Sequence, residues 1–146
     1  MITCEFEDGN KACLRHVVVD VLVVENDKIL LAKRASHLSN GGKFGLIGGY
    51  VNRDETIEGA VIREVEEETG YKVEIIKQLK VVDNPNRANE DRQNIAFLFL
   101  AKPLEKIGEP DDEAEELKWF SLEDLPKEED FAFDHFESLS WYLQNK

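Results

Sequence analysis

The chain has 146 residues, of which 42% are hydrophobic and 34% are charged, and it carries a formal net charge of -13. This composition is typical of one soluble domain with a sizeable core and excludes intrinsic disorder. The strong negative charge disfavours nonspecific binding to a nucleic acid polymer or an anionic membrane, because both need a basic surface. We therefore expect a single domain over residues 1–146 that binds neither.

No targeting or membrane-spanning segment is predicted. The longest apolar run, residues 17–24, contains Asp20 and is too short to cross a bilayer. The N-terminus has no basic region followed by an apolar one. Cys4 and Cys13 form neither a disulfide framework nor a metal-binding spacing. We expect reduced thiols and a cytoplasmic location.

The first part of the chain predicts a hairpin and a glycine-rich bend. Residues 11–25 are apolar and β-branched, as in a buried strand. A turn at 25–27 precedes the return strand, residues 28–34. After a polar loop at 36–43, residues 44–51 are apolar and rich in glycine, which indicates strands with a tight bend.

A helix is predicted from about Thr56 to Thr69. Asp54 is a plausible N-cap, since its carboxylate can accept hydrogen bonds from the first turn. Gly70 fits the position after the helix, where φ is positive.

The rest of the chain alternates strands with polar loops. We expect strands at 71–82, 93–101 and 116–120, loops at 83–92 and 102–115, a capped helical turn at 121–125, and a last helix at 130–143. Phe131, Phe133 and Phe136 are interpreted as the packing face of that helix. The histidines have no ligand spacing and no predicted role. Strands mixed with two separated helices predict an α/β (α+β) sandwich, with helices on both sides of a mixed sheet.

Carboxylates overlap the apolar face of the first helix. Because a helix turns about 100° per residue, Glu64 lies about 20° from Ile57 and Glu68 about 20° from Val61, with Glu67 beside both acids. Crowded, partly buried carboxylates repel one another and take up protons. A divalent Mg²⁺ or Mn²⁺, which prefers oxygen ligands, would resolve this conflict. The alternative is a charged helix face exposed to solvent.

The stretch that contains this helix resembles the signature of the Nudix hydrolase family, G-x5-E-x7-R-E-U-x-E-E-x-G-U, in which U is apolar. The signature positions are occupied by Gly49, Glu55, Arg63, Glu64, Val65, Glu67, Glu68, Gly70 and Tyr71. The order of strands and helices also fits, over roughly residues 11–143. The resemblance implies a Nudix-like α/β/α sandwich and metal-dependent hydrolysis of a phosphoanhydride bond in a nucleoside diphosphate linked to a group X.

The resemblance also implies a metal site for Mg²⁺ or Mn²⁺. Its ligands would be Glu64, Glu67, Glu68 and the carbonyl of Gly49. Arg63 would pair with Glu55 or Glu67 and hold the carboxylates in place, which is compatible with an ordinary helix ion pair.

The general base is placed differently among family members. It is either Glu64 or Glu67, or an acid on a distant loop, for which we favour Glu113 or Glu116. The alternative for the last two is an acidic loop exposed to solvent.

Substrate recognition is predicted from a second, shorter motif. The segment DNPNR that ends at Arg87, together with Arg92, resembles the ADP-ribose pyrophosphatase-like branch of the family. Guanidinium groups there could contact a terminal phosphate or ribose hydroxyls. The alternative is surface arginines paired with Glu90 or Asp91.

Two aromatic residues, Phe44 and Tyr50, flank the glycines. They could stack on a nucleobase, or they could be ordinary core aromatics.

Three functions are consistent with these motifs. We favour hydrolysis of ADP-ribose or a related nucleoside diphosphate sugar to a nucleoside monophosphate and a sugar phosphate. The alternative is a pyrophosphohydrolase of oxidised or non-standard nucleoside triphosphates. A third function, a nucleotide-binding sensor without turnover, is disfavoured by the complete set of signature carboxylates. The expected partner is a small nucleoside diphosphate derivative, and a homodimer contact through the last helix is a further possibility.

Overall fold

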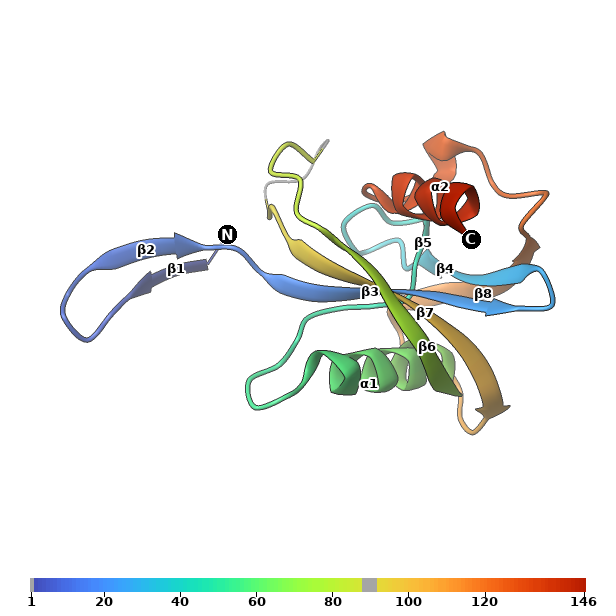
Figure 1. The fold of residues 1–146 in the computed structure, drawn as a ribbon, viewed down its shortest axis with the longest axis horizontal. Coiled ribbons are helices and arrows are strands. Elements are labelled where there is room, and N and C mark those ends of the chain that lie inside the picture. The colour runs from blue at the N-terminus through green and yellow to red at the C-terminus, as the bar shows by residue number, and fades with distance from the viewer. Residues whose placement is uncertain (1, 88–91) are drawn as a thin grey trace.

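A computed structural model describes residues 2–87 and 92–146, which form a mixed β-sheet with one helix on each face (Figure 1). The helices are α1 (Ile57–Thr69) and α2 (His135–Asn145). The strands of the sheet are β3 (Val17–Glu25), β4 (Lys28–Arg34), β5 (Phe44–Gly45), β6 (Tyr71–Val82), β7 (Ile95–Lys106) and β8 (Ala114–Ser121). Their order is β5-β4-β3-β7-β6, with β8 paired to β4, and β3 and β7 are parallel. The predicted α/β/α sandwich is confirmed.

The central strand β3 holds the glycine-rich segment in place. Near the hairpin turn β3 pairs with β4, but farther back residues 47–51 lie along it instead. The Val19 amide donates to the Gly49 carbonyl at 2.9 Å, and the Val21 amide donates to the Ile47 carbonyl at 2.8 Å. The two glycines that begin the signature are thus fixed against the middle of the sheet.

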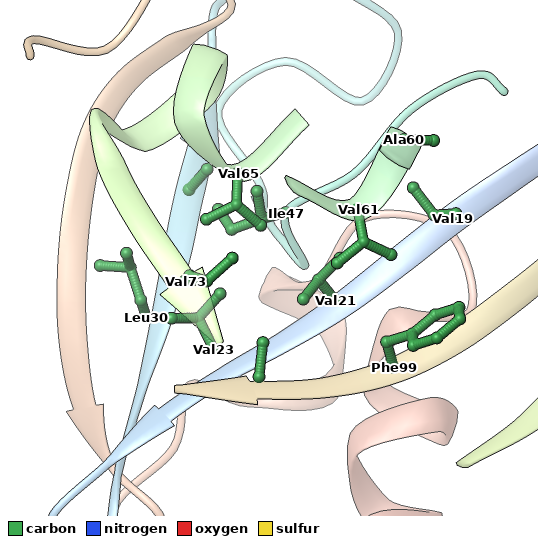
Figure 2. Close-up of a cluster of buried hydrophobic side chains, with 12 residues drawn as sticks. Val19, Val21, Val23, Leu30, Ile47, Ala60, Val61, Val65, Val73 and Phe99 are labelled. Atoms are coloured by element: carbon green, nitrogen blue, oxygen red, sulfur yellow. The ribbon is translucent and has the colours of Figure 1, made fainter. Parts of the chain in front are cut away.

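Apolar packing fixes α1 on one face of the sheet. Val61 and Val65 are fully buried against β3 residues that include Val19 and Val21 (Figure 2). Burial of each such side chain contributes about 1.5–3 kcal/mol. A second cluster, which includes Leu139 of α2, packs on the opposite face. The buried stripe of α1 therefore fixes the direction of the acidic residues between its apolar positions.

The two ends of α1 test the predicted caps. Thr56, not Asp54, is the N-cap, and its hydroxyl accepts from the Gly59 amide at 3.0 Å. Asp54 instead has a φ of 65°, in the turn just before the helix. At the other end the prediction is confirmed, since Gly70 adopts the left-handed conformation with a φ of 71°.

The prediction of one strand over 11–25 is wrong. The chain forms a separate hairpin of β1 (Ile2–Glu5) and β2 (Lys11–Leu14), which extends away from the main sheet, before β3 begins (Figure 1). The interruption has a physical cause at Arg15, whose guanidinium donates to the carbonyls of Gln93 and Asp83, both at 2.6 Å. These bonds hold the chain against the residues that follow β6 and precede β7.

The boundaries of later elements also differ from prediction. The strand predicted at 93–101 continues through Pro103 to Lys106, because the β6–β7 register shifts beside that proline. The last helix begins at His135 rather than at 130. A 3₁₀ turn at Glu128–Asp130 and the positive φ of Phe133, 54°, separate it from the preceding chain. Among the described residues, neither helix has the length or apolar content that a membrane crossing requires.

Candidate active site

The glycine pair lies against the acidic face of α1. A Cβ atom added to Gly49 would lie 2.5 Å from Oε1 of Glu64, so only glycine leaves room for that carboxylate. The neighbouring Gly48 amide points toward Oε2 of Glu68 at 3.4 Å. The backbone and the carboxylates therefore form one oxygen-rich surface. The carboxylates can lie this close to the backbone because glycine has no side chain.

Arg63 connects the carboxylates of the signature. Its Nε donates to Oε1 of Glu55 at 2.8 Å, and its Nη1 donates to Glu64 at 2.8 Å and to Glu67 at 2.9 Å. The predicted contact with Glu55 or Glu67 is thus present with both. The hydrogen bond with Glu55 raises the pKa of the guanidinium, and the hydrogen bonds from Arg63 lower the pKa of the Glu55 carboxyl. Both groups stay charged around neutral pH.

Burial disfavours the charged form of two carboxylates of the signature, Glu64 and Glu68. Glu68 is only 7% exposed, and burial, followed by the negative charge of Glu64, raises the pKa of its carboxyl well above the usual range. Burial likewise raises the pKa of Glu64, although Arg63 acts in the opposite direction. A cation placed at this surface would favour the ionised form of both groups.

The chemistry of the donors fits a hard divalent cation. Residues 2–87 and 92–146 hold no group of three or more His, Cys, Asp and Glu side chains already gathered as a metal site. The available donors are nevertheless the oxygens that Mg²⁺ and Mn²⁺ prefer, namely the carboxylates of Glu64, Glu67 and Glu68. The Gly49 carbonyl, the other predicted ligand, accepts a hydrogen bond from the Val19 amide.

A cleft of about 390 Å³ joins this surface to the face of the sheet that α2 covers. Among the residues that line it are six predicted from the sequence: Gly49, Tyr50, Glu64, Arg87, Arg92 and Glu113. The volume is in the range of small-molecule sites. The cleft has carboxylates at Glu64 and Glu113 and guanidinium groups at Arg87 and Arg92, so it combines both charges that a metal-dependent phosphate enzyme needs.

The two candidates for a base on the distant loop are placed differently. Glu113 lines the cleft, and its negative charge contributes to the raised pKa of both Glu64 and Glu68. Glu116 lies on β8 opposite Lys33, is exposed, and does not line the cleft. The structure thus brings Glu113, but not Glu116, to the carboxylates.

The two predicted stacking residues are also separated. The Phe44 ring packs edge-on against Phe120 at 4.9 Å within the apolar cluster beneath α2, and it does not line the cleft. Tyr50 is 44% exposed, lines the cleft, and accepts a hydrogen bond from Nη1 of Arg92 at 3.0 Å. Of the two, only Tyr50 can touch a bound molecule there.

Arg87 is not the surface arginine of the alternative interpretation. Its side chain is 6% exposed and forms an ion pair with Asp134, whose side chain is 10% exposed. The pairing considered with Glu90 or Asp91 lies outside the described residues.

Several residues that line the cleft were missed by sequence reasoning, among them Asp20, Arg34, Phe133 and His135. Phe133 was expected to pack under the last helix with Phe131, yet it faces the cleft. His135 is buried, and its Nδ1 accepts from the Leu46 amide at 2.9 Å. The one available signal was Asp20, an isolated acid in an apolar strand.

Burial shifts the two ionisable groups at the bottom of the cleft. The Nε2 atom of His135 lies 3.6 Å from Oδ1 of Asp20. Burial raises the pKa of Asp20 and lowers the pKa of His135, in each case toward the uncharged form.

Comparison with known proteins agrees with this geometry. A family model for the NUDIX domain matches residues 14–142. The chain is 35% identical over 130 residues to an ADP-ribose pyrophosphatase of Methanocaldococcus jannaschii, covering 89% of this chain and 74% of that protein.

Solved structures show the same likeness. A NUDIX hydrolase from Nitrosomonas europaea has a TM-score of 0.79 at 26% identity, covering 99% of this chain and 86% of that one. A bifunctional NMN adenylyltransferase/ADP ribose pyrophosphatase from Francisella tularensis, complexed with AMP and a manganese ion, has a TM-score of 0.74 at 28% identity. It covers 90% of this chain but 42% of that longer chain. Together with the complete signature, the family match shows that the chain belongs to the Nudix family of hydrolases.

Proposed function

We propose that the chain acts as one Nudix domain that hydrolyses a phosphoanhydride bond in ADP-ribose or a related nucleoside diphosphate sugar, with Mg²⁺ or Mn²⁺ as cofactor. The products are a nucleoside monophosphate and a sugar phosphate. The observation that carries the proposal is that Gly49 and Glu64, which we call the acidic end, line the same cleft as Arg87 and Arg92, which we call the basic end.

The acidic end performs the chemistry. Glu64, Glu67, Glu68 and the Gly49 carbonyl would hold the metal, which screens the anionic phosphates and lowers the pKa of a water molecule. Arg63 positions these carboxylates, since its hydrogen bonds to Glu55, Glu64 and Glu67 fix their orientation. Removing Arg63 would allow the acids to separate.

We assign the general base to the acids that line the cleft. Glu113 and Glu64 both face the space in which a substrate would lie, whereas Glu116 does not. A carboxylate at either position can accept the proton of an attacking water. Arg63 donates a hydrogen bond to Glu64, but none of its hydrogen bonds in the described structure reaches Glu113, which favours Glu113 for this role.

Two further observations support the choice of substrate. The relative from Methanocaldococcus jannaschii, which is named as an ADP-ribose pyrophosphatase, covers most of this chain. The Francisella tularensis structure, of which 42% resembles this fold, contains AMP and a manganese ion. Adenylate is one of the two products expected from ADP-ribose.

Product identification tests the proposal. The full chain is incubated with Mg²⁺ and, separately, ADP-ribose, nucleotide sugars, dinucleoside polyphosphates and nucleoside triphosphates, and the products are identified by mass. We expect AMP and ribose 5-phosphate from ADP-ribose, with no reaction in EDTA. Pyrophosphate released from a triphosphate, with ADP-ribose unchanged, would instead establish the alternative function. No turnover with either metal would favour a sensor without activity.

A further inference from the structure

Three arginines surround the Phe133 ring in the cleft. The guanidinium carbons of Arg34, Arg87 and Arg92 lie 5.1, 5.5 and 6.0 Å from the centroid of the ring. Arg34 ends β4, and the other two come from the connection between β6 and β7. All four side chains line the same cleft as Glu64. Residues far apart in the sequence thus form one cationic cluster.

Arg87 gives the cluster an unused donor. Its side chain is 6% exposed, and Nη2 is paired with Asp134. Its Nε is buried and, among the residues that the structure describes, has no hydrogen-bond partner. A buried N–H group without an acceptor is unfavourable, so an oxygen atom of a ligand in the cleft would relieve this cost.

The surrounding chain holds the cluster in position before any ligand binds. The segment that carries Phe133 is fastened on both sides: the Ala132 amide donates to the Phe44 carbonyl at 2.7 Å, and Nδ1 of His135 accepts from the Leu46 amide. The Nε of Arg34 donates to the Ser39 carbonyl at 2.8 Å. Binding would therefore require little further ordering of these side chains.

The charge of the cluster selects an anion. Three guanidinium groups gather here in a chain whose net charge is -13. Among the described residues, Arg87 is paired with Asp134, and Asp20, Glu64 and Glu113 also line the cleft. Guanidinium groups present several N–H donors in a plane, which matches the oxygens of a phosphate. A basic cluster inside an acidic protein also draws anions specifically to this place.

We propose that Arg34, Arg87 and Arg92, arranged around Phe133, form a preformed phosphate subsite that binds the phosphate group of one product and the corresponding phosphate of the substrate. The choice of a phosphate ester rests on the proposed function. The phosphate can belong to the nucleoside monophosphate or to the sugar phosphate, since both carry the same chemical group. Arg34 and Phe133 are thereby added to the residues that recognise the substrate.

Calorimetric binding to the full chain in EDTA tests the subsite without metal or turnover. The probes are ribose 5-phosphate, AMP and ribose. We expect a phosphate ester to bind and ribose not to bind, with affinity that falls as salt rises. Tighter binding of ribose 5-phosphate would assign the subsite to the sugar phosphate, and tighter binding of AMP to the nucleotide.

Matched variants identify the groups responsible. Arg34→Gln and Arg87→Gln should each weaken phosphate binding about tenfold or more, since each removes charge-assisted hydrogen bonds. Arg53→Gln is the control, because the Arg53 side chain is 93% exposed and pairs only with its neighbour Asp54 in the described structure. Thermal melts check that each variant folds. If Arg87→Gln does not fold, Arg34→Gln still tests the subsite, because Arg34 is only half-buried.

Two results would overturn the subsite: equal affinity for ribose and ribose 5-phosphate, or unchanged binding in both the Arg34 and Arg87 variants. The proposed reaction fails separately. A protein that binds phosphate esters through these arginines but hydrolyses nothing in the product panel would keep the subsite and lose the reaction.

Discussion

The two ends of the cleft are built in different ways. The acidic end comes from one continuous stretch, in which a helix and the glycines before it bring carboxylates together. The basic end comes from β4, the connection after β6 and the segment before α2. The two ends also differ in the surroundings of their buried ionisable groups. Arg87 is paired with the opposite charge of Asp134, whereas burial and the like charge of Glu64 disfavour the charged form of Glu68. The buried charge of Arg87 is thus balanced within the protein, whereas the buried acids at the other end would be stabilised by an added cation.

The largest effect is expected from breaking the buried pair at the basic end. Asp134→Ala leaves the Arg87 charge buried without its partner, which should reduce the free energy of unfolding by about 3–5 kcal/mol. Thermal or urea unfolding measures the change. Glu129→Ala is the control, because Glu129 is exposed and its contact with Lys127 should contribute less than about 1 kcal/mol. Equal stability of the two variants would contradict the contrast between the ends.

At the acidic end the main effect should be on turnover. Glu67→Gln removes a proposed metal ligand and should lower kcat by about 10² or more, on the scale of losing metal or acid–base catalysis. Steady-state hydrolysis of ADP-ribose measures it. Glu66→Gln on the same helix is the matched control, since Glu66 is exposed and, unlike Glu67, receives none of the Arg63 hydrogen bonds in the described structure. Near-normal turnover by the Glu67 variant would count against the metal site.

The role of Arg63 predicts an intermediate effect. Arg63→Lys keeps the charge but loses the planar group that contacts Glu55, Glu64 and Glu67 together. We expect metal affinity or kcat/KM to fall about 10- to 100-fold, as for groups that orient metal ligands. Titration of activity with Mg²⁺ measures this. A lysine variant with normal metal dependence would show that charge alone is sufficient.

The smallest predicted effect concerns the stability of the protein without metal. Because burial raises the pKa of Glu68, the folded state retains a proton that the unfolded state loses, so stability falls as pH rises above the ordinary glutamate range toward the raised pKa. In EDTA at pH 8, Glu68→Gln should therefore have a higher Tm than the natural protein, by about 2–4 °C for each kcal/mol relieved.

The same variant gives its own internal check. The difference in Tm between the natural protein and Glu68→Gln should shrink toward pH 4, because the folded natural protein then carries a protonated, uncharged Glu68. A Tm difference that does not change with pH would trace the effect to packing rather than to the charge of Glu68.

The acidic end could be predicted from the sequence because its parts are local. Helical spacing alone places Glu64 and Glu68 beside the apolar stripe, and the structure shows them against Gly49 and Gly48. The order of strands and the helix end at Gly70 are local patterns as well.

The basic end could not be predicted in the same way. The partner of Arg87 is Asp134, 47 residues away, and no local spacing connects them. The pattern of phenylalanines also misled, because Phe133 has a positive φ and leaves the periodicity of the helix that follows. Long-range contacts decide these positions, so only the fold reveals them.

The kinetic division between the two ends is the most direct test. Steady-state constants for ADP-ribose hydrolysis are measured for Glu67→Gln and Arg34→Gln beside the natural protein. We predict that Glu67→Gln lowers kcat with little change in KM, whereas Arg34→Gln raises KM about tenfold with little change in kcat. An Arg34 variant that loses kcat as Glu67→Gln does, while KM stays constant, would contradict the division of the cleft into a chemical end and a phosphate-binding end.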